Sequence, residues 1–152
     1  MKKTIMKTFK VKLVKDTSSL YELECNGIVR SPEDAYEIFN KVFDAENLTK
    51  EHLFLASLNT KNKVVALHIV HIGSVNASIV HSREVFQLAL LDNASSIIIA
   101  HNHPSGDPSP SQEDVQVTRR IVEAGKIIGI ELLDHVIIGE NCFNSLKEKG
   151  YV

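Results

Sequence analysis

The chain has 152 residues, of which 43% are hydrophobic and 24% are charged, and its formal net charge is −2 at pH 7. This length fits one globular domain with a continuous core. The two cysteines, Cys25 and Cys142, lie far apart and outside any Cys-x-x-Cys pattern, which argues against a disulfide framework and a thiolate zinc site. Lysines interrupt the start of the chain and no segment reaches the ~20 apolar residues of a membrane span, so we expect a cytoplasmic protein without a membrane anchor.

Positive charge is concentrated at the N-terminus. Six of the 17 basic residues fall within residues 1–15, where there is no acidic residue. Residues 16–152 hold the other 11 basic residues and all 19 acidic ones, a formal net charge of −8. A module that binds duplex DNA normally carries a basic face across its fold. We therefore expect nucleic-acid binding to be weak and carried by the N-terminal lysines.

The first half of the chain predicts a hairpin, a helix and two paired strands. Alternating residues at 8–14 and 21–25 predict a β-hairpin, so that residues 1–30 form an extension in front of a main domain at 31–152. The capping pattern from Ser31 to Asp34 begins a helix that runs to about Phe43. Apolar segments at 53–59 and 63–72 flank a short polar loop and predict antiparallel strands. In the second strand, a period of two would place His68 and His71 on opposite faces.

Helices and strands continue to alternate in the second half. A helix is expected from Ser82 to about Leu91, followed by a fully apolar strand at 95–103. A second capping pattern, Ser111 to Asp114, begins a helix to about Gly125. Residues 128–139 read as one or two closing strands, and residues 142–150 as a short terminal helix stopped by Gly150. This order predicts the α/β class with a mixed sheet.

Three residues with metal-binding side chains lie in the segment "HNHPSGDPSPSQED" at 101–114. His101 and His103 are two apart in a strand, so both imidazoles point to the same side. A proline-rich loop then leads to Asp114 near the start of a helix. Two imidazoles and one carboxylate around Zn²⁺ leave one open position, where a bound water has a pKa near 7. The alternative is a pair of surface histidines and a helix-capping aspartate, but the coincidence of three potential ligands with a proline-rich loop at a strand-to-helix junction favours a zinc site.

The spacing of these residues resembles a known family. His101-x-His103, seven residues, Ser111, two residues and Asp114 match the signature of the JAMM (MPN/JAB) zinc metalloproteases. Together with "SREVFQLAL" before it and "LLDH" after it, the segment resembles the RadC-type branch over residues 31–152. The resemblance implies a cytidine-deaminase-like α/β/α fold with a mixed central sheet, and hydrolysis of peptide or isopeptide bonds in a peptide or protein substrate. Many RadC-type proteins begin with a helix-hairpin-helix segment, and the predicted hairpin departs from that pattern.

The resemblance also implies two catalytic roles. The JAMM pattern has a glutamate at the start of an early strand that takes the proton from the attacking water, and Glu51 occupies that place. Glu84, near the first turn of a helix, is the alternative. Ser111 matches the family serine that polarises the scissile carbonyl, and it is also a helix N-cap. His135 is either an outer partner of a metal ligand or a structural residue.

Two other functions stay open at this point. One is a DNA-repair-associated module that binds or processes nucleic acid, which the acidic body argues against. The other is a scaffold that retains the metal without turnover. A cytidine deaminase is not expected, because its His-x-Glu and Pro-Cys-x-x-Cys motifs are absent.

Overall fold

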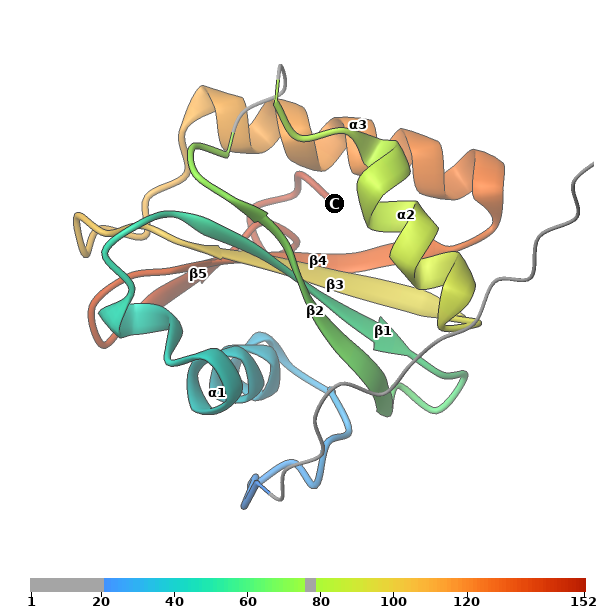
Figure 1. Ribbon diagram of the computed structural model, residues 1–152, viewed down its shortest axis with the longest axis horizontal. Helices are drawn as coiled ribbons and strands as arrows, with labels where there is room; N and C mark the ends of the chain where they lie inside the picture. The colour runs from blue at the N-terminus through green and yellow to red at the C-terminus, as the bar shows by residue number, and fades with distance from the viewer. Residues whose placement is uncertain (1–20, 76–78) are drawn as a thin grey trace, which may run out of the picture.

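A computed structural model of the chain describes residues 21–75 and 79–152 (Figure 1). The helices are α1 (Pro32–Phe43), η1 (Ala45–Asn47, a short 3-10 helix), α2 (Ser82–Leu91) and α3 (Gln112–Ile128). The strands are β1 (His52–Leu58), β2 (Val64–Ile72), β3 (Ser96–Asn102), β4 (Glu131–Ile138) and β5 (Phe143–Ser145). Helices interleave with strands, so the predicted α/β class is confirmed.

The strands form one mixed sheet in the order β2-β1-β3-β4-β5. Strand β1 is antiparallel to both β2 and β3, as predicted for the first two strands. Strand β4 is parallel to β3 and antiparallel to β5. Parallel neighbours need a crossover connection, which α3 supplies. The segment that leaves β3 and enters α3 therefore lies at the end of a central strand.

Helices cover both faces of the sheet (Figure 1). Helix α1 packs on one face, where Phe39 and Phe54 belong to the same buried cluster. Helices α2 and α3 pack on the other face, where Phe86 and Ile121 lie in a second cluster. All seven residues of β3 are buried. Among the described residues, no helix is both long enough and apolar enough to span a bilayer.

Helix α3 extends further than predicted, to Ile128 instead of about Gly125. It ends at Gly129, which adopts a left-handed conformation with φ of 85°. Gly125 serves packing: a Cβ atom at that position would lie 2.4 Å from the carbonyl oxygen of Ile130. The glycine that ends the helix is thus the second of the two.

The predicted terminal helix at 142–150 is wrong. Residues Phe143–Ser145 form β5, which pairs with the end of β4, and residues 146–150 form a turn. The hydroxyl of Ser145 donates a 2.7 Å hydrogen bond to Asp134 of β4. The backbone N–H of Lys147 donates to the same carboxylate at 3.1 Å. The backbone of this segment therefore pairs with β4, and the Ser145 hydroxyl and the Lys147 N–H bind Asp134 of that strand, so no helix forms here.

The N-terminal hairpin is only partly within the described residues. Its first strand, at 8–14, lies outside them. The second, expected at 21–25, is not formed: residues 21–23 have no regular structure and residues 24–27 form a turn. Asn26 and Gly27 have φ values of 52° and 73°, which end any extended conformation at that point.

Candidate metal centre

The side chains of His101, His103 and Asp114 converge at the C-terminal end of β3 and the start of α3. One ligand atom from each lies within 4.8 Å of the others. The Nε2 atoms of the two histidines are 3.0 Å apart. Asp114 Oδ1 lies 3.0 Å from the Nε2 of His101, and Oδ2 lies 3.5 Å from that of His103. The structure thus brings together the three residues that the sequence predicts as metal ligands.

The loop between the histidines and α3 is fastened to the turn between β4 and β5. The backbone N–H of Glu140 donates to the carbonyl of Gly106 at 3.0 Å, and the Asn144 amide donates to Pro108 at 2.8 Å. The close approach requires Gly139, because a Cβ atom there would lie 2.3 Å from the Gly106 oxygen. The C-terminal hairpin therefore holds the loop that positions His103.

A capping box at the start of α3 orients Asp114. Its Oδ2 atom accepts hydrogen bonds from the backbone N–H and the hydroxyl of Ser111, both at 2.7 Å. Burial raises the pKa of Asp114, but hydrogen bonds with His101, His103 and Ser111 outweigh it and hold that pKa well below its usual range. Asp114 is consequently an ionised carboxylate facing the two imidazoles.

A buried chain of hydrogen bonds connects His101 back to Asp114. His101 Nδ1 lies 2.7 Å from His135 Nε2, and His135 Nδ1 lies 2.7 Å from the Thr118 hydroxyl. That hydroxyl donates to the backbone carbonyl of Asp114 at 2.7 Å. Burial lowers the pKa of His135 well below its usual range, so its ring is neutral.

The partners in this chain assign the protons. The Asp114 carbonyl can only accept, so the Thr118 oxygen is left to accept from His135 Nδ1–H. A neutral His135 then has a lone pair on Nε2, which accepts from His101 Nδ1–H. The Nε2 atom of His101 faces the cluster and is the nitrogen that can bind a metal ion or share a proton with Asp114. His103 presents its Nε2 atom in the same way, because its Nδ1 donates to the carbonyl of Asp107 at 2.8 Å.

This donor set fits a divalent cation. Two lone pairs 3.0 Å apart, with a carboxylate beside them, repel one another unless a proton or a metal ion lies between them. Atoms that ligate a tetrahedral Zn²⁺ at 2.0–2.1 Å lie ~3.3 Å from one another, which is near the separations of the ligand atoms here. The hydrogen bond with Asp114 raises the pKa of His103 against the effect of burial, so a proton competes with a metal ion for the same position.

Glu51 lies beside this cluster. Leu53 of β1 pairs with His101 of β3, and Glu51 lies two residues before Leu53 at this end of the sheet. Its Oε2 atom accepts a 2.8 Å hydrogen bond from the backbone N–H of Val75. The charge of Glu51 also adds, after Asp114, to the causes that raise the pKa of His103. Within the described part of the chain, Glu84 makes no hydrogen bond or ion pair with the three clustered residues.

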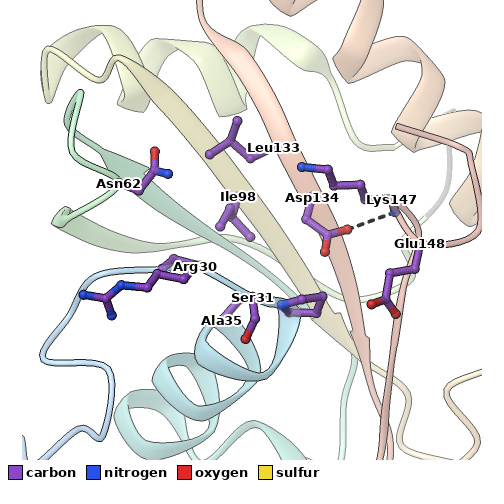
Figure 2. A pocket seen from close by; sticks show the side chains of 11 residues that line it. Arg30, Ser31, Ala35, Asn62, Ile98, Leu133, Asp134, Lys147 and Glu148 are labelled. Atoms are coloured by element: carbon purple, nitrogen blue, oxygen red, sulfur yellow. Dashed lines mark hydrogen bonds between the residues drawn. The ribbon is translucent and has the colours of Figure 1, made fainter.

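A separate cavity of about 430 Å³ lies on the α1 face of the sheet (Figure 2). Asp134 lines it, but its oxygens already accept hydrogen bonds from Ser145 and from the backbone N–H groups of His135 and Lys147. The next residue, His135, points to the opposite face and contacts His101. Asp134 and His135 thus point to opposite faces of the sheet, and the cavity is not part of the metal cluster.

Thr118 is part of the cluster's surroundings that the sequence reasoning missed. It lies four residues after Asp114 on α3, a spacing that puts both on one helix face. That spacing alone carried no signal, since it does not show that His135 of β4 packs against the same face.

Comparisons with known proteins agree with this geometry. A family model described as "RadC-like JAB domain" matches residues 29–151. A UPF0758 protein from Geobacillus thermodenitrificans is 56% identical over 125 residues, which are 82% of this chain and 54% of that protein. The UPF0758 protein YsxA of Bacillus subtilis is 55% identical over 125 residues, which are 82% of this chain and 53% of that protein. The chain thus spans about half the length of the curated relatives it matches.

Proposed function

The chain belongs to the RadC-like JAB domain family, and from this membership and the geometry of the metal cluster we propose that it is a zinc-dependent metallopeptidase. The proposed reaction is the hydrolysis of a peptide or isopeptide bond in a peptide or protein substrate. One observation carries the proposal: the Nε2 atoms of two imidazoles and an ionised carboxylate converge within hydrogen-bonding distance at the end of a central strand.

His101, His103 and Asp114 would hold the zinc ion. When bound by three protein ligands, Zn²⁺ acts as a Lewis acid that lowers the pKa of a water in its open position to about 7 and polarises a carbonyl. The protein fixes the three ligands before the metal arrives. His135 orients His101, the Asp107 carbonyl orients His103, and the capping box orients Asp114.

Glu51 is the proposed general base. Its backbone lies directly before β1, the hydrogen bond from Val75 engages one carboxylate oxygen, and no described residue donates to the other. A carboxylate held near His103 is placed to take a proton from the attacking water and to pass it to the leaving amine. Glu84 has no corresponding contact with the cluster, which supports Glu51 over the alternative.

Ser111 is proposed to polarise the scissile carbonyl. Its hydroxyl donates to Asp114 in this structure, so it must turn to reach a substrate oxygen. The backbone N–H of Ser111 donates to the same carboxylate oxygen at 2.7 Å. Asp114 therefore keeps a hydrogen bond when the hydroxyl leaves, and the serine can serve the helix cap and the substrate in turn.

The test combines metal analysis with a peptide-library screen. Purified protein is loaded with zinc, its metal content is measured, and cleavage of a library of peptides and isopeptide-linked peptides is compared with that of chelator-treated protein. We expect one zinc ion per chain and cleavage that chelation removes and zinc restores. Zinc-loaded protein that cleaves no substrate would support the scaffold function, and protein that takes up no zinc would contradict both.

A further inference from the structure

The residue between the two histidines points to the other face of the sheet. Side chains alternate along β3, so His101 and His103 face the metal cluster and Asn102 faces the α1 side. Asn102 is only 1% exposed. A buried carboxamide needs partners for both its oxygen and its nitrogen. The hydrogen-bond partners of Asn102 therefore indicate which part of the chain it holds in place.

All the hydrogen bonds of the Asn102 side chain go to one segment. Its oxygen accepts from the backbone N–H of His52 at 2.8 Å. Its nitrogen donates to the carbonyls of Leu48 at 3.3 Å and Lys50 at 3.0 Å. These three backbone groups lie on both sides of Glu51. The paired register of β1 and β3 ends at Leu53 and His101, and beyond it the Asn102 side chain takes the place of the missing backbone bonds.

Glu51 passes this constraint to a third segment. Its backbone carbonyl accepts from Gly73 N–H at 2.8 Å, and its carboxylate accepts from Val75 N–H at 2.8 Å. Asn102 thus fixes the backbone of Glu51 from one side, and the residues after β2 fix it from the other. Without Asn102, nothing in the described residues from Leu48 to Glu51 is hydrogen-bonded to β3.

We propose that Asn102 is the positioning residue for Glu51, so that three consecutive residues supply two of the metal ligands and also position the base. The proposal rests on the proposed role of Glu51 in catalysis, but the positioning itself is a property of the fold. Its consequence is that a change at Asn102 displaces the base while the three metal ligands keep their own supports. The effect of the change should therefore pass through Glu51.

The experiment compares two variants of Asn102 with a matched control. Asn102→Leu keeps the branching and the number of side-chain heavy atoms and removes all three hydrogen bonds, whereas Asn102→Asp keeps the acceptor and removes the two donated bonds. Ser57→Ala is the control, because Ser57 is a fully buried polar residue of the same β1 strand whose hydroxyl bonds to Asp92 instead. Glu51→Ala supplies the reference signal of a Val75 amide that has lost its acceptor.

The first measurement is the amide NMR signal of Val75 in the zinc-loaded protein. We expect it to shift towards its position in Glu51→Ala when Asn102 becomes Leu, to shift less in Asn102→Asp, and to stay unchanged in Ser57→Ala. Zinc affinity should stay within about threefold of wild type in the Asn102 variants, well short of the 10–100-fold loss typical of an outer-shell ligand support. A Val75 signal that stays at its wild-type position in both Asn102 variants would overturn the proposal. Should Asn102→Leu fail to fold, Asn102→Asp decides by the same signal.

The second measurement is turnover on a substrate that the wild type cleaves. A displacement of the base by ~1 Å lowers kcat by about 10²-fold, and we expect KM to change little. In a Glu51→Gln background, the Asn102→Leu change should cause no further loss. An additional loss of the same size would show that Asn102 acts by another route. If the wild type cleaves nothing, the proposed function fails, while the Val75 signal still decides whether Asn102 positions Glu51.

Discussion

The α2 and α3 face of the sheet contains two groups of histidine and aspartate, and they differ in how many imidazoles converge on the carboxylate. Around Asp92, the Ser57 hydroxyl and His68 Nε2 both approach one carboxylate oxygen, at 2.6 Å and 2.7 Å. That one oxygen accepts both contacts, and no second imidazole of the described residues takes part. Around Asp114, by contrast, two imidazole nitrogens and a carboxylate converge on one another. Residue types alone do not make a metal site; the convergence of electron-pair donors does.

The first of these groups is also not a nucleophilic site, although it holds a serine, a histidine and an aspartate. In a catalytic triad, the histidine lies between the serine and the acid and takes the hydroxyl proton. Here Asp92 lies between Ser57 and His68. The arrangement joins the end of α2 to β1 and β2, which is a structural role.

Removing one histidine from each group is the strongest way to test the comparison. We expect His101→Ala to lose most of the bound zinc, because only two of the three ligands are left. His68→Ala should retain one zinc ion per chain. Elemental analysis after dialysis measures both, and full occupancy in His101→Ala would show that the acceptors around Asp114 do not form the metal site.

A change from carboxylate to amide separates the base from a bystander. Glu51→Gln keeps the volume and the oxygen that accepts from Val75 but loses the proton acceptor, so turnover should fall by about 10²–10⁴-fold with zinc retained. Glu84→Gln should have little effect on kcat. The two variants are compared on one substrate at equal zinc content. The reverse result would assign the role to Glu84.

The hydroxyl of Thr118 offers a finer test of proton placement. Thr118→Val removes the acceptor of His135 Nδ1–H and allows His135 to place its proton on Nε2, which would force a proton onto the metal-facing nitrogen of His101. Loss of such an outer partner typically weakens metal binding by about 10–100-fold. Thr118→Ser keeps the hydroxyl and should bind zinc like wild type. Calorimetric zinc titrations of the pair give the comparison, and equal affinities would contradict the proton assignment.

Zinc affinity should also depend on pH in a defined direction. The pKa of His103 is raised, chiefly by the hydrogen bond with Asp114, so its proton persists to a higher pH than on an ordinary histidine. Zinc must displace that proton, and its affinity should fall up to about tenfold per pH unit as the pH drops through the pKa of His103. Because the pKa of Asp114 is low, the carboxylate stays ionised in this range. A pH-independent affinity between pH 5 and 8 would contradict the competition.

The smallest effect on zinc binding is expected from a change in the group of Asp92, Ser57 and His68. Asp92→Asn weakens two hydrogen bonds of a side chain that is only 3% exposed, so unfolding free energy should fall by about 1–3 kcal/mol. Zinc affinity should not change. Thermal denaturation and zinc titration of the same preparation test both parts, and a marked loss of zinc would mean that the two groups are coupled.

The proximity of the three predicted ligands could be derived from the sequence because all lie within 14 consecutive residues. The two histidines share a face through strand periodicity, and the capping pattern from Ser111 fixes the start of α3. The same capping reasoning predicted the start of α1 at Ser31. Local chemistry determines these features, and no distant contact is needed to infer them.

The features that could not be predicted depend on distant partners. Asn102 and Thr118 acquire their roles from loops and strands that are far away in the sequence. The β1–β2 pairing also contains register shifts, so that His68 and His71 pair with Leu55 and Leu53 on the same face, contrary to the period of two. A bulge of this kind is set by how two strands pair, which neither strand shows by itself.

The contact between Gly139 and Gly106 has a consequence for how the sequence can vary. The backbone at Gly139 does not need a positive φ, so a scan of allowed conformations would accept any residue there. The surrounding atoms do require glycine, because one added methyl group would clash with the Gly106 oxygen, the Pro108 ring and the Cys142 sulfur. Mutational tolerance at this position is therefore decided by a loop more than thirty residues upstream. A substitution at Gly139 would therefore displace the loop at Gly106 and, through that loop, His103.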